Sequence, residues 1–129
     1  MSSDDDAKAG AAGATWDGQV VEELRSLGGP GEPDLVAELV QTFRDEGVPC
    51  LARIMDGLSR ADAADIGRAA HKLKGGALNL GATRLARAAA ELERAARTGD
   101  AASLAPLAAS VRSEWDRFLA RAAAATAAS

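Results

Sequence analysis

The stretch AHKLKGGALNLGA, residues 70–82, has the apolar spacing of a helix and yet contains two adjacent glycines. A glycine inside a helix costs about 1 kcal/mol relative to alanine. Alanine is abundant elsewhere in the chain, so Gly75 and Gly76 call for a specific reason. The same stretch contains His71, the single histidine of the sequence. The position of the glycines relative to this histidine is therefore the first thing to establish.

The helix around this stretch has a clear apolar stripe. We expect it to begin near Asp62 or Ala63, to run to about Leu80 and to stop at Gly81. At 100° per residue, the stripe lies almost opposite His71. Its members are Ile66, Ala70, Leu73, Ala77 and Leu80. The wheel therefore predicts that His71 faces outward, whereas Gly76 points to a neighbouring helix and serves close packing.

The outward face around His71 is predicted to be nearly bare. Gly67 and Gly75 lie one turn before and one turn after it, where larger side chains would crowd the imidazole. The other residues on or beside this face are Ala64, Arg68, Lys74 and Leu78. The sequence thus predicts an accessible imidazole between two cations, with an exposed leucine nearby.

Apolar residues recur at helical spacing in four further segments. These segments are 16–27, 34–58, 83–97 and 104–119. Gly47 and Pro49 interrupt the second of them, and we expect a kink or two collinear halves there rather than a domain break. Short loops between long amphipathic helices predict an all-α fold: an antiparallel up-and-down four-helix bundle with a short extra N-terminal helix.

The domain organisation follows from length and composition. A chain of 129 residues is long enough for one domain with its own core. Residues 1–14 are small, polar and acidic, and we expect them to form a disordered tail. Residues 15–122 are expected to form the bundle, and the alanine-rich residues 123–129 to fray.

The charges are unevenly distributed along the chain. The net charge of −4 argues against a strongly basic nucleic-acid-binding protein. Residues 15–59 carry 9 acids and 3 bases, whereas residues 60–97 carry 8 bases and 4 acids. His71 therefore lies in the basic part of an acidic protein.

Cysteine usage and hydropathy restrict the class of protein further. The single cysteine, Cys50, excludes an internal disulfide, and its apolar helical surroundings predict a buried side chain. The N-terminus MSSDDDAKAG is acidic, and no run of 18 apolar residues occurs. These features argue against a signal peptide and a membrane span, so we expect a cytoplasmic protein without membrane contact.

The residue types around His71 restrict its chemistry. No serine or cysteine is placed for a hydrolytic pair, and no second histidine, cysteine or acid lies on this face to complete a metal site. A neutral imidazole is a good nucleophile near neutral pH. A phosphoryl group on this ring would find Lys74 and Arg68 within one helical turn, where their charges could offset its own.

These residues match a known family. The run Ala70-His71-Lys72-Leu73-Lys74-Gly75, followed by Gly81-Ala82, resembles the signature of histidine phosphotransfer (HPt) domains of multistep two-component phosphorelays. Leu92-Glu93 is similar to a Leu-Glu pair typical of the family, and the segment 39–49 is similar to the family's second helix. The resemblance covers residues 16–120 and implies the four-helix bundle already expected from periodicity.

The resemblance also implies roles for particular residues. His71 would be the phosphoacceptor, Lys74 its electrostatic helper and Gly75 the clearance for a partner. The partners would be receiver domains of response regulators and hybrid histidine kinases, whose aspartyl phosphate and Mg²⁺ supply most of the transfer chemistry. We expect a monomeric phosphocarrier that binds no cofactor of its own. The predicted docking residues are Ala64, Gly67, Arg68, Gly75 and Leu78.

Two alternatives remain open at the level of sequence. The chain could be the phosphoacceptor domain of a chemotaxis-type histidine kinase, phosphorylated directly from ATP by a partner catalytic domain. It could instead be a helical adaptor that never carries phosphate. The chain contains no Gly-x4-Gly-Lys-Ser/Thr loop, so we do not expect it to bind ATP itself.

Overall fold

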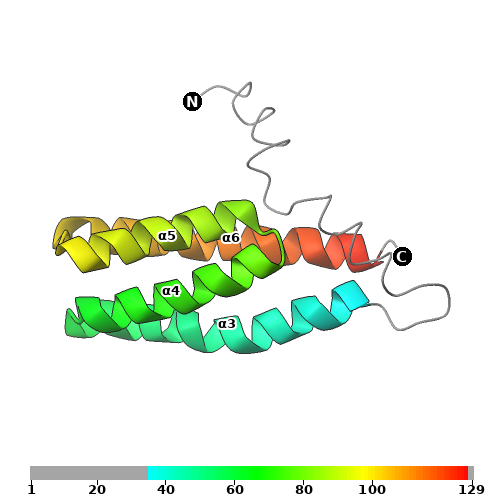
Figure 1. Ribbon diagram of the computed structural model, residues 1–129, viewed down its shortest axis with the longest axis horizontal. Coiled ribbons are helices and arrows are strands. Elements are labelled where there is room, and N and C mark those ends of the chain that lie inside the picture. The colour runs from blue at the N-terminus through cyan, green and yellow to red at the C-terminus, as the bar shows by residue number, and fades with distance from the viewer. Residues whose placement is uncertain (1–34, 128–129) are drawn as a thin grey trace, which may run out of the picture.

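A computed structural model describes residues 35–127, which form four helices joined by short turns (Figure 1). The helices are α3 (Leu35–Arg60), α4 (Ala63–Asn79), α5 (Thr83–Thr98) and α6 (Ala101–Ala127). They run alternately up and down, and each packs against two neighbours around the bundle. The predicted all-α, antiparallel four-helix bundle is confirmed. None of the described helices is long and apolar enough to cross a membrane.

The expected N-terminal features, the tail 1–14 and the helix 16–27, lie outside the described residues. At the other end, α6 continues to Ala127, beyond the predicted end of the domain at residue 122.

In Figure 1, α3 and α6 are the long pair and α4 and α5 the short pair. The turn between α4 and α5 therefore lies partway along the two long helices.

The helix ends follow from local sequence. The Asp62 side chain accepts a hydrogen bond from the backbone N–H of Asp65 at 3.1 Å and so caps the start of α4. Gly81, at φ 70°, follows Leu80, the C-cap of α4, as predicted. Gly99 ends α5 at φ 78°, and this left-handed conformation favours glycine.

The predicted interruption of α3 does not divide it. Pro49 lies inside one continuous helix and is exposed. Gly47 is buried, and the Trp115 ring packs so closely on it that a Cβ atom there would collide with the ring. Gly47 is thus explained by the close approach of α6, and α3 continues through it without a domain break, as expected.

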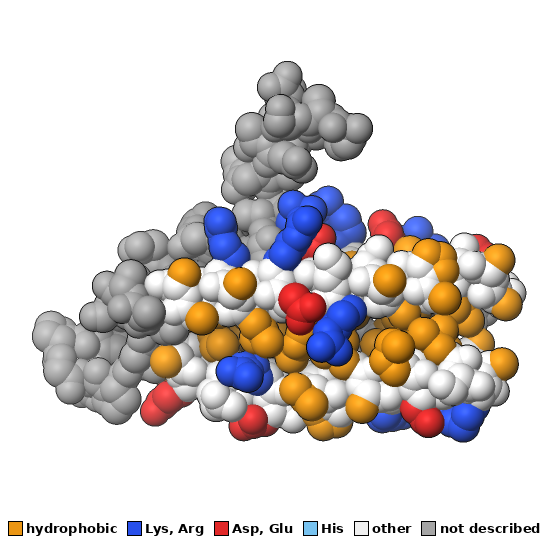
Figure 2. Space-filling view, turned by 180° about the vertical axis from the view of Figure 1, so that it is seen from behind, with side chains coloured by type: hydrophobic (Ala, Val, Ile, Leu, Met, Phe, Trp, Pro, Cys, Tyr) orange, Lys and Arg blue, Asp and Glu red, His pale blue; other side chains and the backbone are white. Residues whose placement is uncertain are grey.

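The core has an aromatic centre between α3 and α6. The Phe43 ring lies 5.2 Å from that of Trp115 and 5.4 Å from that of Phe118, measured between centroids. Hydrophobic side chains fill the seam between the upper and lower helices on the face shown in Figure 2. A Cβ atom on Gly76 would lie 2.8 Å from the Phe43 ring, which confirms the predicted packing role of this glycine. Cys50 is buried, as expected.

Candidate functional site

His71 projects from the outward face of α4. Its side chain is 67% exposed, whereas the predicted apolar stripe of the same helix is buried. The predicted orientation of the histidine is therefore confirmed. Since the ring is not enclosed by the bundle, one of its nitrogens can be reached by another molecule.

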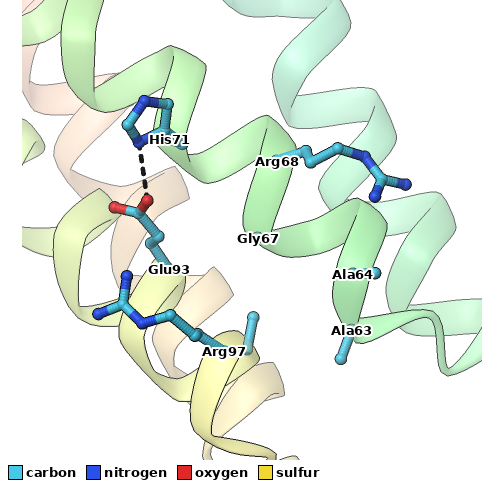
Figure 3. A pocket seen from close by; sticks show the side chains of 8 residues that line it. Ala63, Ala64, Gly67, Arg68, His71, Glu93 and Arg97 are labelled. Carbon is cyan, nitrogen blue, oxygen red and sulfur yellow. Dashed lines mark hydrogen bonds and ion pairs between the residues drawn. The ribbon is translucent and has the colours of Figure 1, made fainter.

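The other ring nitrogen is held by a residue from the next helix. His71 Nδ1 lies 2.7 Å from Glu93 Oε2 on α5 (Figure 3). The second carboxylate oxygen, Oε1, accepts a hydrogen bond from Lys74 Nζ, also at 2.7 Å. The carboxylate of Glu93 is thus shared between the imidazole and the lysine, and its side chain is only 16% exposed.

The charge of Glu93 fixes the tautomer of the ring. The hydrogen bond from Lys74 holds the pKa of the Glu93 carboxyl below its usual range, against partial burial, and the hydrogen bond with His71 lowers it further. An ionised carboxylate only accepts hydrogen bonds, so Nδ1 carries the proton and donates it. In the neutral ring, the free lone pair is then on Nε2.

The two glycines that the wheel placed symmetrically about His71 differ in the structure. Gly75 is exposed, and a Cβ atom there would meet nothing within 4 Å. Gly67 is half-buried, and a Cβ atom there would lie 3.3 Å from that of Ala96. The fold therefore has no packing requirement for Gly75, whereas Gly67 lies where α4 and α5 approach closely.

The remaining predicted residues share the outward face but not the same surroundings. Ala64 and Leu78 are exposed, Leu78 to 60%. Arg68 turns away from the imidazole, and its guanidinium lies 3.5 Å from Asp65 (Figure 3). Lys74 is thus linked to His71 by the carboxylate that both contact, whereas Arg68 has no contact with that carboxylate and pairs with Asp65 instead.

Asp65 is the centre of an ion-pair cluster beside the turn between α3 and α4. It lies 2.6 Å from Arg53, 3.2 Å from Arg60 and 3.5 Å from Arg68. These arginines hold the pKa of Asp65 below its usual range, chiefly through the hydrogen bond from Arg53. This cluster explains the orientation of Arg68, because Asp65 lies one turn before it on α4.

A groove of about 370 Å³ runs beside His71 between α4 and α5 (Figure 3). It is lined by Ala63, Ala64, Gly67, Arg68, His71, Glu93, Ala96 and Arg97. The sequence did not assign Ala63 or the last three of these to the site. The one signal in the sequence was the Leu92-Glu93 pair, which resembles a pair typical of the family. That resemblance did not indicate which residues Glu93 contacts.

The site is thus an exposed histidine whose Nδ1 is held by a carboxylate, on the surface of an antiparallel four-helix bundle. The family model for the Hpt domain matches residues 38–125, and the chain belongs to this family. Hpt domains function in histidine phosphotransfer in phosphorelays, where they interact with receiver domains and act as phosphocarriers. The comparison with curated proteins gives no match.

Proposed function

We propose that this protein accepts a phosphoryl group on His71 from the aspartyl phosphate of one receiver domain and passes it to another. The observation that supports this most is the contact between Nδ1 and Glu93, together with the exposure of the ring. The contact orders the imidazole and directs the lone pair to Nε2, which is the nucleophile.

With this tautomer, the phosphoryl group passes from the aspartate to His71 in a single displacement at phosphorus. The Nε2 lone pair attacks phosphorus, the Nε2–P bond forms, and the P–O bond to the aspartate breaks with its electron pair returning to the carboxylate. The ring then bears a positive charge, since Nδ1 keeps its proton. The Glu93 carboxylate at 2.7 Å stabilises this charge as it develops. Transfer to the second receiver follows the same steps in reverse.

Lys74 has two tasks in this proposal. It fixes the Glu93 carboxylate through the 2.7 Å hydrogen bond, and its charge offsets that of the phosphoryl group. The Mg²⁺ that neutralises charge on the donor belongs to the receiver. We assign no cofactor to this chain.

The docking face of the receiver includes the open strip along α4. Gly75 leaves space above the backbone next to His71, and Leu78 supplies exposed apolar surface one turn further on. We expect the protein to work as a monomer in the cytoplasm. One receiver would be bound at a time, because both receivers must reach the same imidazole.

A phosphotransfer assay tests the proposal. Incubation with phosphorylated receiver domains should give an acid-labile, base-stable phosphoryl group on the wild-type chain and none on His71→Gln. Label that appears only with ATP and a kinase catalytic domain would identify the chain as a chemotaxis-type phosphoacceptor instead. Absence of label from every receiver and kinase in a panel would identify an adaptor.

A further inference from the structure

The groove beside His71 has an apolar floor, and two arginines, Arg68 and Arg97, are among the residues that line it. Ala64 and Gly67 of α4 and Ala96 of α5 contribute the floor. Gly67 and Ala96 are small enough that the two helices come close together here, and neither carries a side chain that would fill the groove. His71 lies at one end of this groove (Figure 3).

Arg97 differs from Arg68, the other arginine that lines the groove. It is exposed, lies in the last turn of α5, and pairs with no acid among residues 35–127. Figure 3 shows its side chain lying back along α5 toward Glu93. Arg68, by contrast, reaches away from the groove to Asp65, which also binds two other arginines. Arg97 is therefore the arginine available to a molecule bound next to His71.

We propose that the groove receives an apolar side chain of the partner receiver, and that Arg97 pairs with an acidic residue beside it. This inference rests on the proposed function, because it names the part of the receiver that lies next to His71. Charge complementarity favours an acidic occupant. Residues 60–97, which supply all of the groove's lining, carry 8 bases and 4 acids.

The charge of Arg97 is tested by its reversal. Transfer rates are measured for the full chain from receivers pre-loaded at their aspartate, with wild type, Arg97→Glu and Arg97→Lys. Arg97→Glu should slow transfer about tenfold, and Arg97→Lys should stay within about twofold of wild type, because it keeps the charge. Arg94→Glu is the matched control, since Arg94 is exposed on the same helix but outside the groove.

A small donor separates docking from chemistry. Phosphoramidate phosphorylates imidazole without a docked protein: the Nε2–P bond forms, the P–N bond of the donor breaks, and ammonia leaves. All the arginine variants should be labelled by phosphoramidate at the wild-type rate. An equal loss with both donors would mean that Arg97 acts on the phosphoryl group, and would overturn the docking proposal. An equal effect of Arg94→Glu, or no effect of Arg97→Glu, would also overturn it.

The floor of the groove is tested by filling it. Ala64→Phe should slow transfer from receivers about tenfold while phosphoramidate labelling is kept, and Ala109→Phe, at an exposed position of α6, should change neither. Thermal unfolding of each variant verifies the fold, since a cation in the last turn of α5 also stabilises the helix. A wild-type dimer that Ala64→Phe converts to monomer would assign the groove to a second copy and overturn the proposal.

If phosphoramidate labels wild type but no receiver does, the proposed function fails and this inference with it. If receivers label wild type and Arg97→Glu at equal rates, only the inference fails. The two failures are thus distinguished within one set of assays.

Discussion

The short helices α4 and α5 and the long helices α3 and α6 use opposite kinds of residue where they meet. Between α3 and α6 the contacts are aromatic: the Phe43 ring lies 5.2 Å from that of Trp115 and 5.4 Å from that of Phe118. Between α4 and α5 they are small, as at Gly67 and Ala96. Large aromatic rings bury much apolar surface, whereas small residues allow two helices to approach closely.

The difference shows where stability and function are separated in this bundle. The close approach of α4 and α5 allows the Glu93 carboxylate to reach both His71 and Lys74 at 2.7 Å. Larger residues at the α4–α5 contact would move these groups apart. The aromatic side of the bundle has no such requirement and is free to be packed for stability alone.

The largest expected effect is on the aromatic side. Phe118→Ala removes a fully buried ring and should lower the free energy of unfolding by about 3–5 kcal/mol. Denaturant unfolding followed by circular dichroism measures it. Leu78→Ala, which truncates an exposed side chain of α4, is the control and should change stability by less than about 0.5 kcal/mol. A similar loss for both variants would contradict the division between the two sides.

The neighbouring glycines 75 and 76 give the next largest effect and should behave in opposite ways. Gly76→Leu brings side-chain atoms into the Phe43 ring and should destabilise the bundle by about 1–3 kcal/mol. A Cβ atom at Gly75 meets nothing within 4 Å, so Gly75→Leu should stabilise α4 by up to about 1 kcal/mol, while it slows phosphotransfer sharply. Unfolding and transfer rates are measured on both. An unchanged transfer rate for Gly75→Leu would remove the argument that this glycine provides clearance.

Glu93→Gln tests the contact between α4 and α5. The variant keeps an acceptor for Nδ1 but loses the charge, so transfer should slow about tenfold, equivalent to about 1.4 kcal/mol. The fold should be retained. A wild-type rate in Glu93→Gln would show that the carboxylate charge has no part in the reaction.

The same variant should alter the response to acid. Because the pKa of Glu93 is lower in the folded protein than its usual value of 4.5, its ion pair stabilises the fold above that value, and the stabilisation is lost as the pH falls through the lowered pKa. Unfolding free energies between pH 6 and pH 3 should therefore fall less steeply for Glu93→Gln than for wild type. Equal slopes would mean that the ion pair contributes no net stability.

The smallest effect concerns the end of the bundle distant from the aromatic cluster. Asp62→Ala removes the cap of α4 and should cost about 1 kcal/mol of unfolding free energy. Phosphotransfer should be unchanged, because Asp62 lies more than two turns from His71. Asp62→Asn, which keeps a capping oxygen, should recover most of the stability.

The sequence by itself determined which residues of each helix face the core. The burial of Ile66, Leu73 and Ala77 and the exposure of His71 were predictable, because helical periodicity is a property of the local chain. The end of α4 at Gly81 was predictable for the same reason, since its backbone conformation depends on a few neighbouring residues. The four-helix bundle follows from these faces and from the short turns between them.

The tertiary structure alone decided which groups surround His71. Glu93 and Arg97 reach the site because α5 is placed at a particular height and rotation against α4, and no periodicity within one helix contains that information. Gly67 and Gly75 looked equivalent on the wheel and differ because α5 approaches only one of them. Arg68 turns away because Asp65 binds it on the side of α3. Local spacing thus fixes the direction of a side chain, whereas its partners depend on contacts between helices.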